Sequence, residues 1–405
     1  MFDLLRRETS SGKFIAQIDG LRFVAIGTVV LFHLAVGLSI RDPVTYAVPL
    51  YGNLIASVAR QGFHGVELFF IISGFILGYP FASYHLKGKK PVILKQYFLR
   101  RVTRLEPPYL LCMSIIFVGL VCVKGRGFTE LLPHFLASIF YLHNLVFGSE
   151  SLINNVAWSL EIEIQFYLLV PLLSRLFLIR RSASRRLLMV GICFMSIIFS
   201  WMFIGGESIL YHSILRYIHF FLIGFLLVDF YIVEWNENPS RNVWWDLITI
   251  VGWPLLFLVW NLPELSPSFS AIGHGPVLEV VLFPVIAFFL YCAVFRGTIT
   301  SRVMQSPWVT TIGGMCYTLY LFHNQLMGPL IKYSCGFAPF SSYSLNFMVQ
   351  CLLVIPPVIA FSGVYFVLIE KPCMRRDWPS RLLKRVEFAV VYCRELLNSQ
   401  KNRTS

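Results

Sequence analysis

The sequence predicts an all-α, polytopic integral membrane protein with about ten transmembrane helices. Of its 405 residues, 57% are hydrophobic and only 14% are charged, whereas about a quarter of the residues in a soluble domain are charged. The apolar residues gather in runs of about 20, the length that crosses a bilayer as a helix. Lysine and arginine gather in short blocks between these runs, as in cytoplasmic loops. These three observations exclude a water-soluble globule.

The net charge of +13 is divided among loops and does not form one continuous basic patch. We therefore expect membrane lipids, and no nucleic acid, as the partners of this charge. The first apolar stretch, residues 23–40, is too long for the apolar part of a cleavable signal. No small-residue cleavage site follows it, so we expect it to remain as the first span.

Ten segments are apolar and long enough to be predicted as transmembrane helices. They cover residues 22–40, 63–81, 108–124, 160–179, 187–204, 214–233, 244–260, 276–295, 309–330 and 346–369. A further apolar stretch, residues 131–147, contains Pro133, His134, His143 and Asn144. We predict a re-entrant or interfacial helix there.

The basic residues predict which side of the membrane each loop occupies. An even number of spans places both termini on one side, and 28 of the 34 lysines and arginines then fall on that side. Basic loops are retained in the cytoplasm, so both termini are predicted to be cytoplasmic. Residues 1–372 are predicted to form the transmembrane domain, and residues 373–405 a basic cytoplasmic tail.

The first span combines an arginine and a histidine. Polar side chains inside a span are costly and commonly functional. Arg22 and His33 are 11 residues apart, which places them about 20° from the same helix face and roughly 16 Å apart along the axis. Arg22 is therefore expected at the cytoplasmic edge and His33 near the middle of the membrane, and Asp19 can cap the helix. A purely structural histidine remains the alternative.

The second span and the following loop add further charged residues. Glu67 is expected near the outer end of the second span, whereas Ser73 and Gly74 favour close helix packing over catalysis. Arg101 and Arg104 share a helix face at the cytoplasmic surface. Paired arginines bind phosphate well, either in a ligand or in lipid headgroups.

The fourth span begins with Trp158 and carries two carboxylates, Glu161 and Glu163, on its outer side. Tyr167 lies one turn after Glu163, on the same face. A helix N-terminus attracts anions, so capping explains part of this pattern. We favour a functional role for Glu163, and leave Glu161 undecided.

The ninth span carries Tyr317, Tyr320 and His323 at three-residue spacing, which predicts one polar stripe. His323 is a second candidate for proton chemistry or acceptor binding. Aromatic packing around a buried histidine is the alternative. The residues that begin the sixth span are expected to line the same cavity: Arg216, Tyr217 and His219.

Taken together, these motifs resemble acyltransferase family 3, whose members transfer acyl groups to envelope sugars, exopolysaccharides and some secreted small molecules. The matching segments occur in the family's order over nearly the whole chain: Ile18–Arg22 with His33, Glu67–Phe75, Arg101–Arg104, Trp158–Glu163 with Tyr167, Tyr317–His323 and Glu370–Pro372. One departure is Glu67, where Asp is common. Many members carry a periplasmic hydrolase-like domain after the spans. We expect no such domain after the spans here, so any second transfer step is expected to need a partner or not to occur.

The resemblance implies an enzyme of the inner membrane that transfers an acyl group from cytoplasmic acyl-CoA to a hydroxyl of an extracytoplasmic acceptor. Acetyl-CoA is the expected donor. The acceptor is expected to be a polysaccharide sugar or a small hydroxylated molecule. His33 is the expected base or acyl carrier, with Glu163 and His323 orienting the acceptor. The remaining roles are CoA binding by Arg22, Arg101 and Arg104, and acceptor binding by Glu67, Trp158, Tyr167 and Tyr320. No metal is expected.

Two other classes of function compete with this one. A proton-coupled secondary transporter would use His33, Glu163 and His323 as a relay, but it predicts inverted repeats that are not evident. A non-catalytic scaffold or lipid sensor would not need charged residues in or at the ends of its spans, so this class does not explain them. The identity of the acceptor, the acyl chain length and the oligomeric state stay open.

Overall fold

The computed structural model describes residues 5–8, 14–46, 53–204, 208–265 and 274–375, together with residues 377, 378 and 380. The regular structure in this part of the chain is helical. Its α-helices are α2 (Ala16–Arg41), α3 (Leu54–Arg60), α4 (Gly65–Lys87), α5 (Leu94–Cys122), α6 (Phe128–Ile139), α7 (His143–Phe147), α8 (Trp158–Leu173), α9 (Ser182–Phe203), α10 (Ile214–Val233), α11 (Trp244–Leu265), α13 (His274–Arg296), α14 (Ile299–Met304), α15 (Pro307–Gly314), α16 (Cys316–Ser334), α17 (Tyr343–Tyr365) and α18 (Lys371–Cys373). The predicted tail, residues 373–405, lies almost entirely outside the described residues.

Nine of the ten predicted segments coincide with one α-helix each, and the ninth segment, residues 309–330, is divided between α15 and α16. Within the described residues, seven helical stretches are long and apolar enough to cross a membrane. They contain α2, α3 with α4, α5, α8, α9, α10 and α17. Two further predicted spans are helices whose apolar parts are shorter, over Trp244–Val259 and Leu282–Arg296. The all-helical membrane fold is thus confirmed, whereas the number of ten spans and the cytoplasmic termini stay predictions.

The outer surface of α9 shows why lipid must surround the fold. Leu187 is 74% exposed and Met195 is 66% exposed, and Trp201 is also exposed. A contiguous apolar surface of this kind is rare on water-soluble monomers. In a bilayer the same side chains face acyl chains without an energetic penalty.

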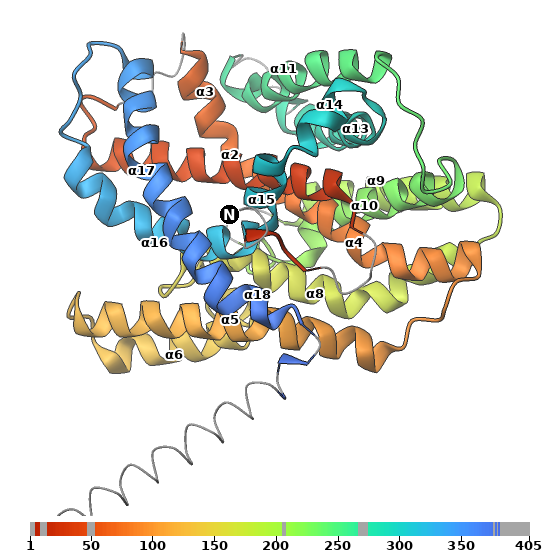
Figure 1. Cartoon of the computed structure of the whole chain (residues 1–405), viewed down its shortest axis with the longest axis horizontal. Coiled ribbons are helices and arrows are strands. Elements are labelled where there is room, and N and C mark those ends of the chain that lie inside the picture. Colours follow the sequence, from red (N-terminus) through yellow and green to blue (C-terminus); the bar gives the residue numbers. More distant parts are fainter. Residues whose placement is uncertain are drawn as a thin grey trace, which may run out of the picture.

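The segment predicted to be re-entrant or interfacial forms two short helices, α6 and α7. Figure 1 shows α6 alongside α5, with which it packs. A helix of 12 residues is about 18 Å long, too short to cross the hydrocarbon core. The helical nature of residues 131–147 is confirmed, and their depth in the membrane stays a prediction.

Helix α2 crosses the middle of the molecule and packs against α4, α15 and α16 (Figure 1). This central position directs the polar residues of α2 toward the interior of the bundle. Helices α4 and α10 are also in close contact. A Cβ atom at Gly74 of α4 would lie only 2.1 Å from the carbonyl oxygen of Phe221 of α10. The prediction that Ser73 and Gly74 allow a second helix to approach closely is confirmed.

A second close contact holds α15 against α2 beside Asp19. A Cβ at Gly313 would lie 1.8 Å from the carbonyl oxygen of Asp19. We expect Gly313→Ala to lower the free energy of unfolding by about 1–3 kcal/mol, the usual cost of overpacking. Thermal unfolding in detergent measures this effect. Gly191→Ala is the control, because a Cβ there meets nothing within 4 Å, and equal stability of the two variants would contradict the prediction.

Candidate active site

Two cavities follow one another along α2. The arginine cavity, of about 100 Å³, is lined by residues that include Arg22, Arg101, Arg104, Glu163 and Cys316. The histidine cavity, of about 690 Å³, is lined by residues that include His33, His64, Glu67, Trp158 and Arg216. The structure therefore brings the three predicted CoA-binding arginines together and places His33 in a separate space.

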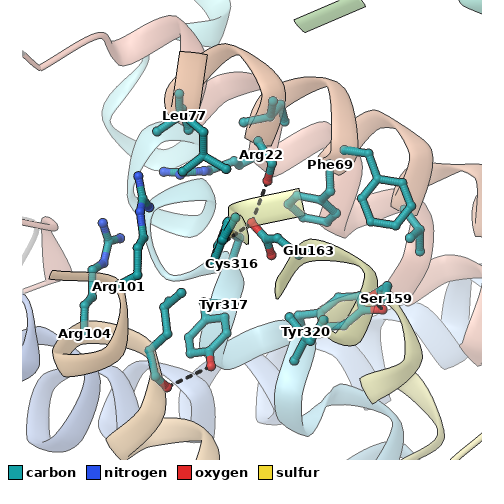
Figure 2. Close-up of a pocket in the computed structure, with 18 of the residues that line it drawn as sticks. Arg22, Phe69, Leu77, Arg101, Arg104, Ser159, Glu163, Cys316, Tyr317 and Tyr320 are labelled. Carbon is teal, nitrogen blue, oxygen red and sulfur yellow. Dashed lines mark hydrogen bonds between the residues drawn. The ribbon is translucent and has the colours of Figure 1, made fainter. Parts of the chain in front are cut away.

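The arginine cavity is electropositive at one end. Figure 2 shows Arg101 and Arg104 near each other, with Tyr320 at the opposite end. The Arg101 guanidinium lies 5.4 Å from the centre of the Tyr167 ring. The Nε of Arg104 is buried and has no hydrogen-bond acceptor in the described part of the chain. An unsatisfied guanidinium is a strong donor, so this end can bind an anion.

Asp19 accepts hydrogen bonds from two guanidinium groups beside this cavity. Its carboxylate accepts a hydrogen bond from Arg22 Nη1 at 2.8 Å and one from Arg7 Nε at 3.0 Å. Burial, followed by repulsion from Arg22, lowers the pKa of Arg7 to about 9 despite the nearby carboxylate. The local environment thus holds more positive charge than Asp19 neutralises.

Glu163 lies in the arginine cavity. Its Oε1 accepts hydrogen bonds from the Ser73 hydroxyl and the Tyr167 hydroxyl, both at 2.7 Å. We expected Glu163 to orient an acceptor on the outer side, but the structure groups its carboxylate and Tyr167 with the arginines. The contact with Ser73 was not anticipated, because the sequence favoured a packing role for that residue.

Sequence reasoning assigned no role to Glu370, which also lines the arginine cavity. Its carboxylate accepts hydrogen bonds from the backbone N–H and the hydroxyl of Thr318. Glu370 ends a π-helical turn, Phe366–Glu370, and such turns are frequent at functional sites. Four arginines and three carboxylates thus gather in or beside this cavity: Arg7, Arg22, Arg101, Arg104, Asp19, Glu163 and Glu370.

His33 and His323 form a hydrogen-bonded pair. The Nδ1 of His323 lies 2.9 Å from the carbonyl oxygen of Tyr320, so this nitrogen carries the proton and Nε2 is the acceptor. His33 Nδ1 lies 3.2 Å from that Nε2 and 3.0 Å from the carbonyl oxygen of Val29. His33 is therefore assigned as a donor through Nδ1, and in the neutral imidazole this assignment leaves Nε2 unprotonated. His323 is fully buried and lines neither cavity, and its ring is connected to the histidine cavity through its contact with His33.

Three of the four expected acceptor-binding residues line the histidine cavity, namely Glu67, Trp158 and Tyr320, whereas Tyr167 lines the arginine cavity. Glu67 accepts a hydrogen bond from His64 Nδ1 at 2.7 Å. The Trp158 ring lies 4.8 Å from the ring of His212, a residue that the sequence did not single out. The prediction that the start of the sixth span lines the same cavity as Tyr320 is confirmed for Arg216, Tyr217 and His219.

Tyr320 and Val66 line both cavities and separate them. The Tyr320 hydroxyl donates to the carbonyl oxygen of Val156 at 2.9 Å and accepts from the Ser159 hydroxyl at 2.6 Å. These bonds hold the phenol in place between the arginines and His33. A group that passes from one cavity to the other must therefore pass these two side chains.

Comparison with known proteins identifies the family. A model described as an acyltransferase domain, that of acyltransferase family 3, matches residues 15–367. The chain belongs to this family. The matched range includes every residue that lines the two cavities except Glu370. It also excludes Arg7, which lies beside the arginine cavity.

The relatives of this chain include O-acetyltransferases of Staphylococcus aureus. O-acetyltransferase OatA of strain NCTC 8325 / PS 47 is 24% identical over 329 residues, which cover 77% of this chain and 50% of the relative. The protein SACOL0978 of strain COL, provisionally named an O-acetyltransferase, is 22% identical and covers 94% of this chain and 61% of the relative. The chain thus spans about half the length of OatA. No solved structure matches the chain significantly.

The arrangement offers acid–base chemistry and anion binding. Among the described residues, no group of three or more His, Cys, Asp or Glu side chains is placed to hold a metal ion. The available groups are an unprotonated imidazole nitrogen in one cavity and guanidinium donors in the other. These are the groups that transfer of an acyl group from an anionic donor to a hydroxyl requires.

Proposed function

We propose that the protein is a membrane-bound O-acyltransferase that moves an acetyl group from acyl-CoA to a hydroxyl of an extracytoplasmic sugar. The observation that carries the proposal is the relation between the two cavities. Guanidinium donors line one, His33 lines the other, and only Val66 and Tyr320 line both. Membership of acyltransferase family 3 favours this activity over a proton-coupled transporter or a scaffold.

On the donor side, the phosphates of acyl-CoA bind the guanidinium groups of Arg22, Arg101 and Arg104. The planar fork of arginine suits phosphate oxygens. The arginine cavity is small, about 100 Å³, so the acyl end of the donor extends past the arginines into the histidine cavity once Tyr320 moves aside. The nucleotide remains at the cytoplasmic surface in this proposal.

On the acceptor side, His33 Nε2 removes the proton of the sugar hydroxyl as its oxygen attacks the thioester carbonyl. The C–S bond breaks, and the CoA thiolate takes the proton back from the imidazolium. His323 Nε2 accepts the Nδ1–H bond throughout and stabilises the positive charge on His33. The alternative route, in which Nε2 first carries the acetyl group, uses the same nitrogen.

The proposal places donor and acceptor on opposite sides of the inner membrane. In vesicles containing protein of known orientation, acetyl-CoA should be used only from the cytoplasmic face. A mixture of neutral and acidic methyl glycosides should be acetylated only on the other face, as measured by mass spectrometry. Product formed with both substrates confined to the cytoplasmic side would contradict the transmembrane arrangement. Absence of transfer to any glycoside would contradict the proposed activity on sugars.

A further inference from the structure

One wall of the histidine cavity carries nitrogen atoms without hydrogen-bond partners. Arg216 Nη1, His212 Nδ1 and His219 Nδ1 are buried, and each has no partner in the part of the chain that the structure describes. All three side chains line the same cavity. Buried polar atoms are nearly always satisfied in folded proteins. Three unsatisfied nitrogens on one wall therefore indicate that a ligand completes it.

Arg216 supplies a permanent positive charge to this wall. Its guanidinium lies 3.5 Å from the centre of the Tyr211 ring and 5.4 Å from that of Tyr217. These aromatic faces orient the guanidinium and shield it from water. They do not neutralise it, and no carboxylate among the described residues forms an ion pair with it.

The two histidines add hydrogen-bond donors without adding charge. His219 is only 4% exposed, and its side chain lines the cavity. Burial, followed by repulsion from Arg216, lowers the pKa of His212 to about 4, so this ring is neutral at neutral pH. A neutral imidazole can carry its proton on Nδ1 and donate it to a ligand oxygen.

Two carboxylates line the same cavity, and neither is paired with Arg216. Glu67 accepts a hydrogen bond from His64 at 2.7 Å. Glu150 is exposed, and no ion pair joins it to Arg216 among the described residues. The guanidinium of Arg216 therefore remains available to an anionic group that enters the cavity.

We propose that Arg216, His212 and His219 bind an oxyanion, a carboxylate or a phosphate, on the sugar that receives the acetyl group. This inference rests on the proposed function and narrows its acceptor to acidic sugars. Trp158, 4.8 Å from His212, offers an aromatic face to the sugar ring beside the oxyanion. The hydroxyl to be acetylated then faces His33 in the same cavity.

Binding to the full-length protein in detergent tests the inference without relying on turnover. The ligands are methyl glucuronide, glucose 6-phosphate and the neutral methyl glucoside. The wild-type protein should bind at least one acidic ligand about tenfold or more tightly than the glucoside, as expected for one charge-assisted contact. Tighter binding of methyl glucuronide would indicate a carboxylate site, and tighter binding of glucose 6-phosphate would indicate a phosphate site. Equal affinity for all three ligands would overturn the inference.

Arg216→Gln should bring the ratio of acidic to neutral affinities close to one, and Arg216→Lys should restore part of it. Arg126→Gln is the matched control, because Arg126 pairs with Glu130 at 3.5 Å and lines neither cavity. An unaltered ratio in Arg216→Gln would refute the site. If the wild-type protein acetylates neutral and acidic glycosides equally well, the proposed activity stands and this inference fails. If it binds acidic sugars selectively but acetylates none, the inference stands and the proposed activity fails.

Discussion

His33→Ala is expected to lower the rate of acetyl transfer by about 10²–10⁴-fold, the usual contribution of a general base. The structure gives the reason: the bonds made by Nδ1 leave Nε2 as the free basic nitrogen of His33, a residue that lines the histidine cavity. Alanine removes this nitrogen, and an acyl-histidine could not form either. Transfer from labelled acetyl-CoA to a sugar acceptor, measured in vesicles, reports the loss.

Two further measurements separate chemistry from folding. The affinity for acetyl-CoA should stay close to that of the wild type in His33→Ala, because His33 does not line the arginine cavity. His85→Ala is the control, since His85 belongs to α4 but lines neither cavity. His323→Phe should slow transfer and shift its pH profile, because it removes one of the two acceptors near His33 Nδ1 and leaves only the carbonyl oxygen of Val29. Normal turnover in well-inserted His33→Ala protein would refute the mechanism.

The helices themselves were largely predictable from the sequence, because apolar length and charge placement reflect the bilayer directly. Segments with mixed composition gave the weakest signal. The ninth predicted span is divided into α15 and α16, which begins at Cys316 and carries polar side chains along one face. Helix α16 belongs to the bundle because it packs against α2, a contact that its hydropathy does not predict.

The candidate site was predictable only in part, since spacing reveals neighbours on one helix but not between helices. The contact between His33 and His323 joins residues 290 positions apart. The position of Glu163 shows that the sequence also does not predict depth along a helix to within one turn. Trp158 and Glu163 are five residues apart, about 7.5 Å along a helix, and this distance is enough for them to line different cavities. Loop charges assign a side of the membrane but cannot resolve one turn of a helix.

Loss of an arginine from the other cavity should weaken donor binding and leave the chemical step intact. Arg101→Ala or Arg104→Ala is expected to reduce the affinity for acetyl-CoA by about 1.5–3 kcal/mol, the range for a hydrogen bond to a charged group. Arg104 provides the clearer case, because its buried Nε has no acceptor within the described protein and gains one when a phosphate binds. Lysine at either position should restore binding only partly, since the planar fork is lost.

Equilibrium binding of labelled acetyl-CoA to the purified variants measures this effect. Arg100→Ala is the matched control, because Arg100 precedes Arg101 on α5 yet is exposed and does not line the cavity. The rate at saturating donor should change much less than the affinity, since these side chains contact the phosphates and not the reacting carbonyl. Unchanged donor affinity in both alanine variants would place the phosphate site elsewhere. Equal losses in Arg100→Ala would instead indicate that surface charge alone attracts the donor.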